Sequence, residues 1–139
     1  MKQRILVIDD SKAIGFLLQT ILGKKYNVIA APDGYTAMHW LSKKNLPDIM
    51  IASPQLPDMQ NWELIEYLTG SGLYGTIPLI ALSALSKVET AEKCRELGIE
   101  HYFQKPFNPV ELEKCISKLI IGSIKDIGVA SERLHLKVG

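Results

Sequence analysis

The stretch ILVIDDS, residues 5–11, indicates the fold more directly than any other part of the chain. Its four consecutive apolar residues, Ile5 to Ile8, are typical of a strand buried on both faces of a parallel sheet. Two acids follow, and then Ser11, a residue type preferred at the start of a helix. Apolar residues next recur at the three- and four-residue steps of an amphipathic helix, at Ile14, Leu17, Leu18, Ile21 and Leu22. The stretch therefore predicts a buried strand that leads straight into a helix.

The same alternation of strand and helix patterns continues to about residue 121. Strands are expected at 5–8, 26–31, 49–52, 78–82 and 101–103, and helices at 11–23, 36–44, 61–69, 86–97 and from 109 onward. Asp33-Gly34 is expected to form a turn. Because parallel strands need crossover helices, the pattern predicts an α/β fold, a flavodoxin-like doubly wound parallel sheet of order 2-1-3-4-5 with five helices. Residues 1–121 are the predicted domain and residues 122–139 a C-terminal tail.

Composition narrows the class of protein. The 139 residues suit one domain, and the formal net charge of +1 gives no reason to expect direct binding to nucleic acid or to an anionic membrane. The N-terminal apolar run is too short for a signal peptide, and no stretch has the length of a membrane span. Cys94 and Cys115 have no metal-site or disulfide spacing, so we expect reduced thiols and a cytoplasmic location.

Polar side chains follow four of the predicted strands at the same edge of the sheet. Asp9 and Asp10 follow the first strand, Ser53 the third, Ser83 the fourth and Lys105 the fifth. Adjacent carboxylates suit a hard cation such as Mg²⁺, and a lysine with a hydroxyl suits a phosphoryl oxygen. Together these residues predict a site at the carboxyl ends of the strands, where doubly wound folds bind ligands.

Four motifs in order give the chain a family resemblance: VIDDS at 7–11, PDIMIASPQLPDM at 47–59, IALSA at 80–84 and QKPF at 104–107. They resemble the receiver domains of bacterial two-component response regulators. The resemblance implies that Asp9 and Asp10 hold magnesium, and that Ser83 and Lys105 bind a phosphoryl group.

The resemblance has further implications for the switch and for partners. Tyr102 matches the aromatic residue that changes rotamer on activation, and the bond before Pro106 matches a peptide bond that is often cis. Implied partners are a histidine kinase, a phosphotransfer protein or an output protein. A homodimer through the face of the fourth helix, fifth strand and fifth helix is also implied. Charged candidates on that face are Glu89, Glu92, Lys93, Arg95, Glu96, Glu111, Glu113 and Lys114.

The chain departs from the family at the phosphate-accepting position. The family has an aspartate where this chain has Ser53, and the register is fixed by Pro47-Asp48 before it and Leu56-Pro57 after it. Asn61 also replaces a family glycine, a milder change because asparagine tolerates left-handed backbone geometry. A serine needs a base to become a nucleophile, so we do not expect Ser53 to be phosphorylated.

Loss of one carboxylate also changes the charge of the site. Asp9, Asp10 and Lys105 together carry −1, so magnesium is expected to bind weakly if at all, and Lys105 is expected to pair with one of the acids. No cofactor is required. Asp48 and Asp58 are poor replacement acceptors, since Asp48 precedes the third strand and Asp58 suits a loop or capping role.

Several functions remain open from the sequence. The first hypothesis is a pseudo-receiver that signals through protein–protein interaction without aspartyl phosphorylation. The alternatives are a receiver that senses a metal or small ligand at Asp9 and Asp10, and a receiver phosphorylated at a non-standard site. An enzyme is disfavoured because no nucleophile–base pair or glycine-rich phosphate loop is evident.

Overall fold

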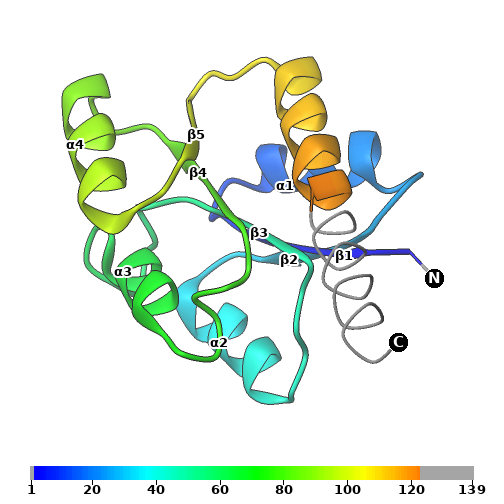
Figure 1. Cartoon of the computed structure of the whole chain (residues 1–139), viewed down its shortest axis with the longest axis horizontal. Coiled ribbons are helices and arrows are strands. Elements are labelled where there is room, and N and C mark those ends of the chain that lie inside the picture. Colours follow the sequence, from blue (N-terminus) through cyan, green and yellow to red (C-terminus); the bar gives the residue numbers. More distant parts are fainter. Residues whose placement is uncertain (1, 123–139) are drawn as a thin grey trace, which may run out of the picture.

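The computed structural model describes residues 2–122, and these form one five-stranded parallel sheet covered by helices on both faces (Figure 1). The strand order is β2-β1-β3-β4-β5, which confirms the predicted flavodoxin-like topology. The predicted tail, residues 122–139, lies outside the described residues except for Gly122. Within residues 2–122, no helix combines the length and the apolar character that a membrane span requires.

Strands and helices alternate strictly along the chain. The strands are β1 (Arg4–Ile8), β2 (Asn27–Ala31), β3 (Ile49–Ala52), β4 (Leu79–Ser83) and β5 (His101–Gln104). The helices are α1 (Lys12–Leu22), α2 (Gly34–Ser42), α3 (Glu63–Gly70) and α4 (Lys87–Leu97), followed by a C-terminal helix at residues 109–122.

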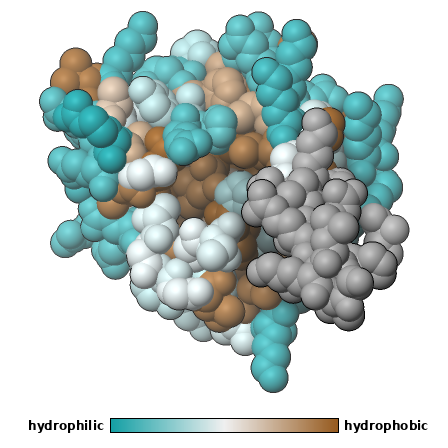
Figure 2. Space-filling model, viewed as in Figure 1, coloured by the Kyte–Doolittle hydropathy of each residue, from teal (hydrophilic) through white to brown (hydrophobic). Residues whose placement is uncertain are grey.

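Successive residues of each strand face opposite layers, as the pleat of a strand requires. Ile5 and Val7 of β1 pack in the layer of α1 and the C-terminal helix. Leu6 and Ile8 pack in the layer of α2, α3 and α4. Figure 1 shows the two layers on either side of the sheet. In the space-filling view from the same side, hydrophilic residues project around the rim and apolar residues show between them at the centre (Figure 2).

Side-chain caps begin several of the helices at the expected places. Ser11 accepts a hydrogen bond from the backbone N–H of Ile14 at 3.2 Å, and Ser86 accepts one from Glu89 at 3.1 Å. Each cap satisfies a backbone donor that has no partner within its helix. Gly98 ends α4 in the left-handed conformation, with φ of 72°.

One local prediction was wrong. Asp33-Gly34 is not a free turn: Asp33 caps α2 through the N–H of Thr36, and Gly34 is the first residue of that helix. The residue in left-handed geometry directly before α3 is Trp62, with φ of 69°. Trp62 is 2% exposed, and its backbone N–H donates to the carbonyl of Pro54 at 2.8 Å.

The two cysteines lie in the helices where the sequence placed them. Cys94 lies on the buried face of α4, and burial raises the pKa of its thiol to about 11. Burial also raises the pKa of Cys115, and Lys118 opposes this effect. Both thiols are therefore protonated at neutral pH and suit packing roles.

Candidate functional site

Asp9 and Lys105 form an ion pair at the carboxyl edge of the sheet. The Lys105 Nζ lies 2.8 Å from Asp9 Oδ2, with the carboxylate side chain only 1% exposed and the lysine side chain 17% exposed. Asp9 Oδ1 accepts a hydrogen bond from the N–H of Ser11 at 2.9 Å. Oδ2 receives no properly directed hydrogen bond from the described residues, so its contact with the ammonium is electrostatic. The pair neutralises the more deeply buried of the two acids.

Ser53 is buried beside this pair and its hydroxyl is engaged within its own loop. The Ser53 Oγ donates to the carbonyl of Gln55 at 3.1 Å and accepts from the N–H of Gln55 at 3.2 Å. Ser53 as a whole is 3% exposed, and its backbone N–H donates to the carbonyl of Ile8 at 2.8 Å. No described carboxylate or imidazole is hydrogen-bonded to this hydroxyl. The serine therefore has no base positioned to activate it.

Ser83, expected at the phosphoryl position, directs its hydroxyl towards α4. Its Oγ lies 2.8 Å from Thr90 Oγ1, and both residues are completely buried. The same oxygen accepts from the N–H of Leu85 at 3.0 Å, while the carbonyl of Ser83 accepts from the N–H of Lys105 at 2.8 Å. Ser83 thus connects the ends of β4 and β5 to the first half of α4. Thr90 was not identified from the sequence, because a threonine within a helix carries no signal of its partner.

The remaining expected site residues lie around this edge. Asp10 is exposed, Tyr102 on β5 is 41% exposed, and the Lys105–Pro106 peptide bond is cis. The side chain of Gln104 donates to the carbonyl of Leu85, which ties β5 to the loop after β4. The structure brings Asp9, Ser53 and Lys105 together, with Asp10 at the rim.

These residues fit a tight magnesium site poorly. Across residues 2–122, no three His, Cys, Asp or Glu side chains are grouped as a metal site would need. One oxygen, Asp9 Oδ2, is free of hydrogen bonds but faces an ammonium group, and the neutral Ser53 hydroxyl is engaged with Gln55. Magnesium demands near-octahedral oxygen coordination, which this donor set does not supply without displacement of Lys105.

Two other acids near Ser53 in the sequence have structural roles. Asp58 accepts from the N–H of Gly34 at 3.0 Å and from that of Tyr35 at 2.8 Å, and these bonds lower its pKa. It thereby caps α2, which confirms the expected capping role. A Cβ on Gly34 would lie 2.5 Å from Met59, so the loop packs directly on the first turn of α2. Asp48 accepts from the N–H of Arg4 at 2.7 Å, at the opposite edge of the sheet.

Part of the charged face expected on α4 is occupied by contacts to α3. The indole N–H of Trp62 donates to Glu89 Oε2 at 3.2 Å. Lys93 donates to Glu66 Oε1 at 2.7 Å, and this bond raises the pKa of Lys93. Glu89 and Lys93 therefore hold α3 and α4 together, and sequence reasoning, which treated them as surface charges, missed this. The sequence signal for this contact was only the opposite charge of Glu66 and Lys93. The two residues lie on different helices and face each other only after the chain has folded.

Comparisons with known proteins agree with the fold. Residues 5–117 match the response regulator receiver domain. The probable transcriptional regulator ycf27 of Porphyridium aerugineum is 34% identical over 122 residues, which cover 86% of this chain and 48% of that protein. The chain thus spans about half the length of such relatives.

A shorter relative and a solved structure are similar along almost their whole length. Sporulation initiation phosphotransferase F of Bacillus subtilis is 26% identical over 121 residues, 86% of this chain and 95% of that protein. The receiver domain of the Francisella response regulator 1452 superposes with a TM-score of 0.77 and 25% identity, covering 87% of this chain and 98% of that one. With the strand order, the acids after β1 and the lysine after β5, these similarities establish that the chain belongs to the response regulator receiver domain family.

Proposed function

We propose that this receiver domain acts in a two-component pathway through protein–protein contacts, without phosphorylation of an aspartate at its sheet edge. The observation that carries the proposal is the state of Ser53, whose hydroxyl both donates to and accepts from Gln55. A phosphate-accepting group must be able to turn its oxygen outward to the donor. Here the oxygen is neutral and buried, and it is held by the loop on both its donor and its acceptor side.

The Asp9–Lys105 pair supports the same proposal. In a receiver that takes up phosphate, as the family resemblance implies, Lys105 would contact the phosphoryl group and Asp9 a metal ion. In this chain each is the other's partner at 2.8 Å. Separating them would leave the buried Asp9 carboxylate without its cation, so the ion pair favours one conformation of the site.

The direct test is exposure of the whole chain to acetyl phosphate and magnesium, followed by intact-mass measurement. We expect no gain of one phosphoryl group. A gain that is lost at alkaline pH would reveal an acyl phosphate and sink the proposal. Peptide mapping of such a product would then separate Asp9, Asp10, Asp48 and Asp58 as non-standard acceptors.

Ser53→Asp is the informative variant for the remaining machinery. It restores a third carboxylate, so magnesium should bind more tightly and acetyl phosphate should add one phosphoryl group. Ser53→Asn is its matched control, with similar size and no charge. Labelling of the aspartate variant alone would mean that Asp9, Asp10 and Lys105 retain the geometry for phosphoryl transfer.

A second candidate function is sensing of a cation or small ligand at Asp9 and Asp10. The lack of a directed hydrogen bond to Asp9 Oδ2 favours it, and a ligand at this oxygen would have to displace the ammonium of Lys105. Titration with magnesium, followed through the fluorescence of Trp40 and Trp62, distinguishes the two. A saturable change at low metal concentration supports sensing, and no change supports the first proposal.

The partners we propose are a histidine kinase, a phosphotransfer protein or an output protein of the same pathway. Receiver domains occur within histidine kinases and in phosphotransfer proteins among the relatives of this chain. A homodimer through α4, β5 and the C-terminal helix stays a prediction, and sedimentation of the chain at several concentrations would test it.

A further inference from the structure

An open groove lies between the C-terminal helix and the segment that follows α1. Its volume is about 420 Å³, and Lys25, which follows α1, forms one wall. The other wall is a stripe of the C-terminal helix with the spacing i, i+3, i+4, i+7 and i+8, which places its members on one face. These residues are Val110, Glu113, Lys114, Ser117 and Lys118.

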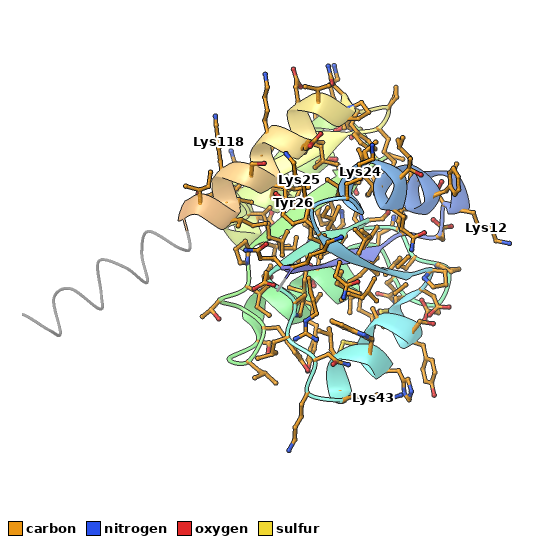
Figure 3. The ribbon with its side chains drawn as sticks, turned by 90° about the vertical axis from the view of Figure 1, so that its right-hand side faces the viewer. Lys12, Lys24, Lys25, Tyr26, Lys43 and Lys118 are labelled. Atoms are coloured by element: carbon orange, nitrogen blue, oxygen red, sulfur yellow. The ribbon has the colours of Figure 1, made fainter. Side chains whose placement is uncertain are left out.

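Positive charge is concentrated around this groove. Its lining has three lysines and one glutamate, a local charge of +2, and Lys24 adjoins it, whereas the whole chain carries only +1. Figure 3 shows Lys24, Lys25 and Lys118 on one side of the molecule near the C-terminal helix, with Lys12 and Lys43 further away. Within residues 2–122, the lining makes a single ion pair, between Lys25 and Glu113 at 3.8 Å, and it is largely exposed.

Exposed apolar side chains accompany the lysines on the same helix. Val110 is 59% exposed at the start of the stripe, and Ile121, eleven residues later on the same face, is 52% exposed. A surface that combines lysines with apolar side chains is complementary to a segment that combines carboxylates with apolar side chains.

A protein partner fits this groove better than a polyanion does. Nucleic acids and anionic membranes present a continuous array of negative charge, and they are bound by broad basic surfaces without acids. Glu113 lies in the middle of the stripe and would repel such an array. A peptide can place a neutral residue opposite Glu113 and its carboxylates opposite the lysines.

We propose that this groove binds a short acidic segment of a partner protein, with carboxylates on Lys114 and Lys118 and an apolar side chain on Val110. The charge of the groove comes from Lys25, Lys114 and Lys118 and does not depend on phosphate at the sheet edge. The inference therefore goes beyond the proposed function.

The test uses the whole ¹⁵N-labelled chain and a synthetic peptide that alternates glutamate and leucine. We expect saturable NMR shift changes at Lys25, Lys114 and Ser117, with affinity that falls steeply as salt rises. The same peptide with glutamine in place of glutamate should give no saturable change. Shift changes elsewhere, or an equal response to the neutral peptide, would overturn the proposal.

Two double variants separate the groove from overall charge. The variant K114Q/K118Q should weaken binding of the acidic peptide by roughly tenfold or more. The matched control K12Q/K43Q removes the same charge from exposed lysines outside the groove and should change affinity by about twofold at most. Equal weakening by both would mean non-specific attraction and overturn the proposal.

Vesicles with one-third phosphatidylglycerol in phosphatidylcholine provide the remaining control. We expect no cosedimentation at physiological salt, and binding that depends on Lys114 and Lys118 would assign the groove to membranes instead. All measurements omit magnesium and phosphodonors. Failure here therefore leaves the proposal for Ser53 intact, and labelling by acetyl phosphate would leave the groove intact.

Discussion

Asp9 and Ser53 follow neighbouring strands and are both buried, yet their polar groups find partners in different ways. The Asp9 carboxylate is paired with a residue 96 positions later, Lys105, whose ammonium lies 2.8 Å away. Ser53 has no charge and meets its needs within two residues, through the backbone of Gln55. One side of the site is therefore held by long-range electrostatics and the other by a local turn.

Asp58 shows a third solution in the same loop as Ser53. Its carboxylate is exposed, and two backbone N–H groups at the start of α2 stabilise the charge. A carboxylate near this edge is therefore stabilised either by a cation, as Asp9 is by Lys105, or by the N–H groups at the start of a helix, as Asp58 is. Substitutions at Lys105, Asp58 and Ser53 test this difference, and their expected effects on stability decrease in that order.

Lys105→Met should have the largest effect. It leaves the Asp9 carboxylate buried without its cation, and we expect a loss of roughly 2–3 kcal/mol in the free energy of unfolding, below the value for a fully buried pair because Lys105 is 17% exposed. Urea denaturation at neutral pH measures it. The double variant D9N/K105M should recover much of the loss, since the uncompensated charge is gone. Equal instability of both variants would show that packing, and not charge, is at stake.

Asp58→Ala should have an intermediate effect, about 1 kcal/mol, because α2 loses its cap from the loop. Backbone N–H groups of Gly34 and Tyr35 lower the pKa of Asp58 in the folded chain. The stabilisation is therefore complete above the unfolded pKa of about 4 and disappears as the pH falls through the lower folded value. The difference in stability between wild type and Ala variant should shrink below about pH 4. A difference that grows on acidification would contradict this sign.

Ser53→Ala should have the smallest effect, about 1 kcal/mol or less, because the backbone carbonyl and the backbone N–H of Gln55 each lose a hydrogen-bond partner. The control is Ser42→Ala, at an exposed hydroxyl bonded to the carbonyl of His39, which should cost less. Thermal unfolding of the three chains measures both. A loss as large as that of Lys105→Met would mean that Ser53 is coupled to the charged side of the site.

The sequence predicted the fold well because its signals are local. The apolar runs of the strands, the caps Ser11 and Ser86 and the ending Gly98 each act within a few residues, and all appear where expected. The first turn of α2 was missed because Asp33-Gly34 also suits a free turn, and only contacts with Met59 and Asp58 decide between the two. Those contacts come from a loop more than twenty residues away.

The sequence predicted which residues lie at the site better than it predicted which of them contact each other. Strand order alone brings Asp9, Ser53 and Lys105 to one edge, and charge counting anticipated that Lys105 would pair with an acid. It could not choose between Asp9 and Asp10, which depends on burial after β1. The bond between Ser83 and Thr90 and the bond between Trp62 and Glu89 depend on how α4 is rotated, and periodicity does not fix that rotation to the precision of a hydrogen bond.

The separation of the two ends of α1 has a consequence for how this molecule can be used. The helix has 11 residues and so a length of about 16 Å, with the acids at its start and Lys24 and Lys25 beyond its end. A standard protein–protein interface covers about 800 Å² on each partner, so it is roughly 30 Å wide and exceeds this separation. Two proteins bound at opposite ends of α1 would therefore compete for space, and a partner at the lysines would hinder one at the acids.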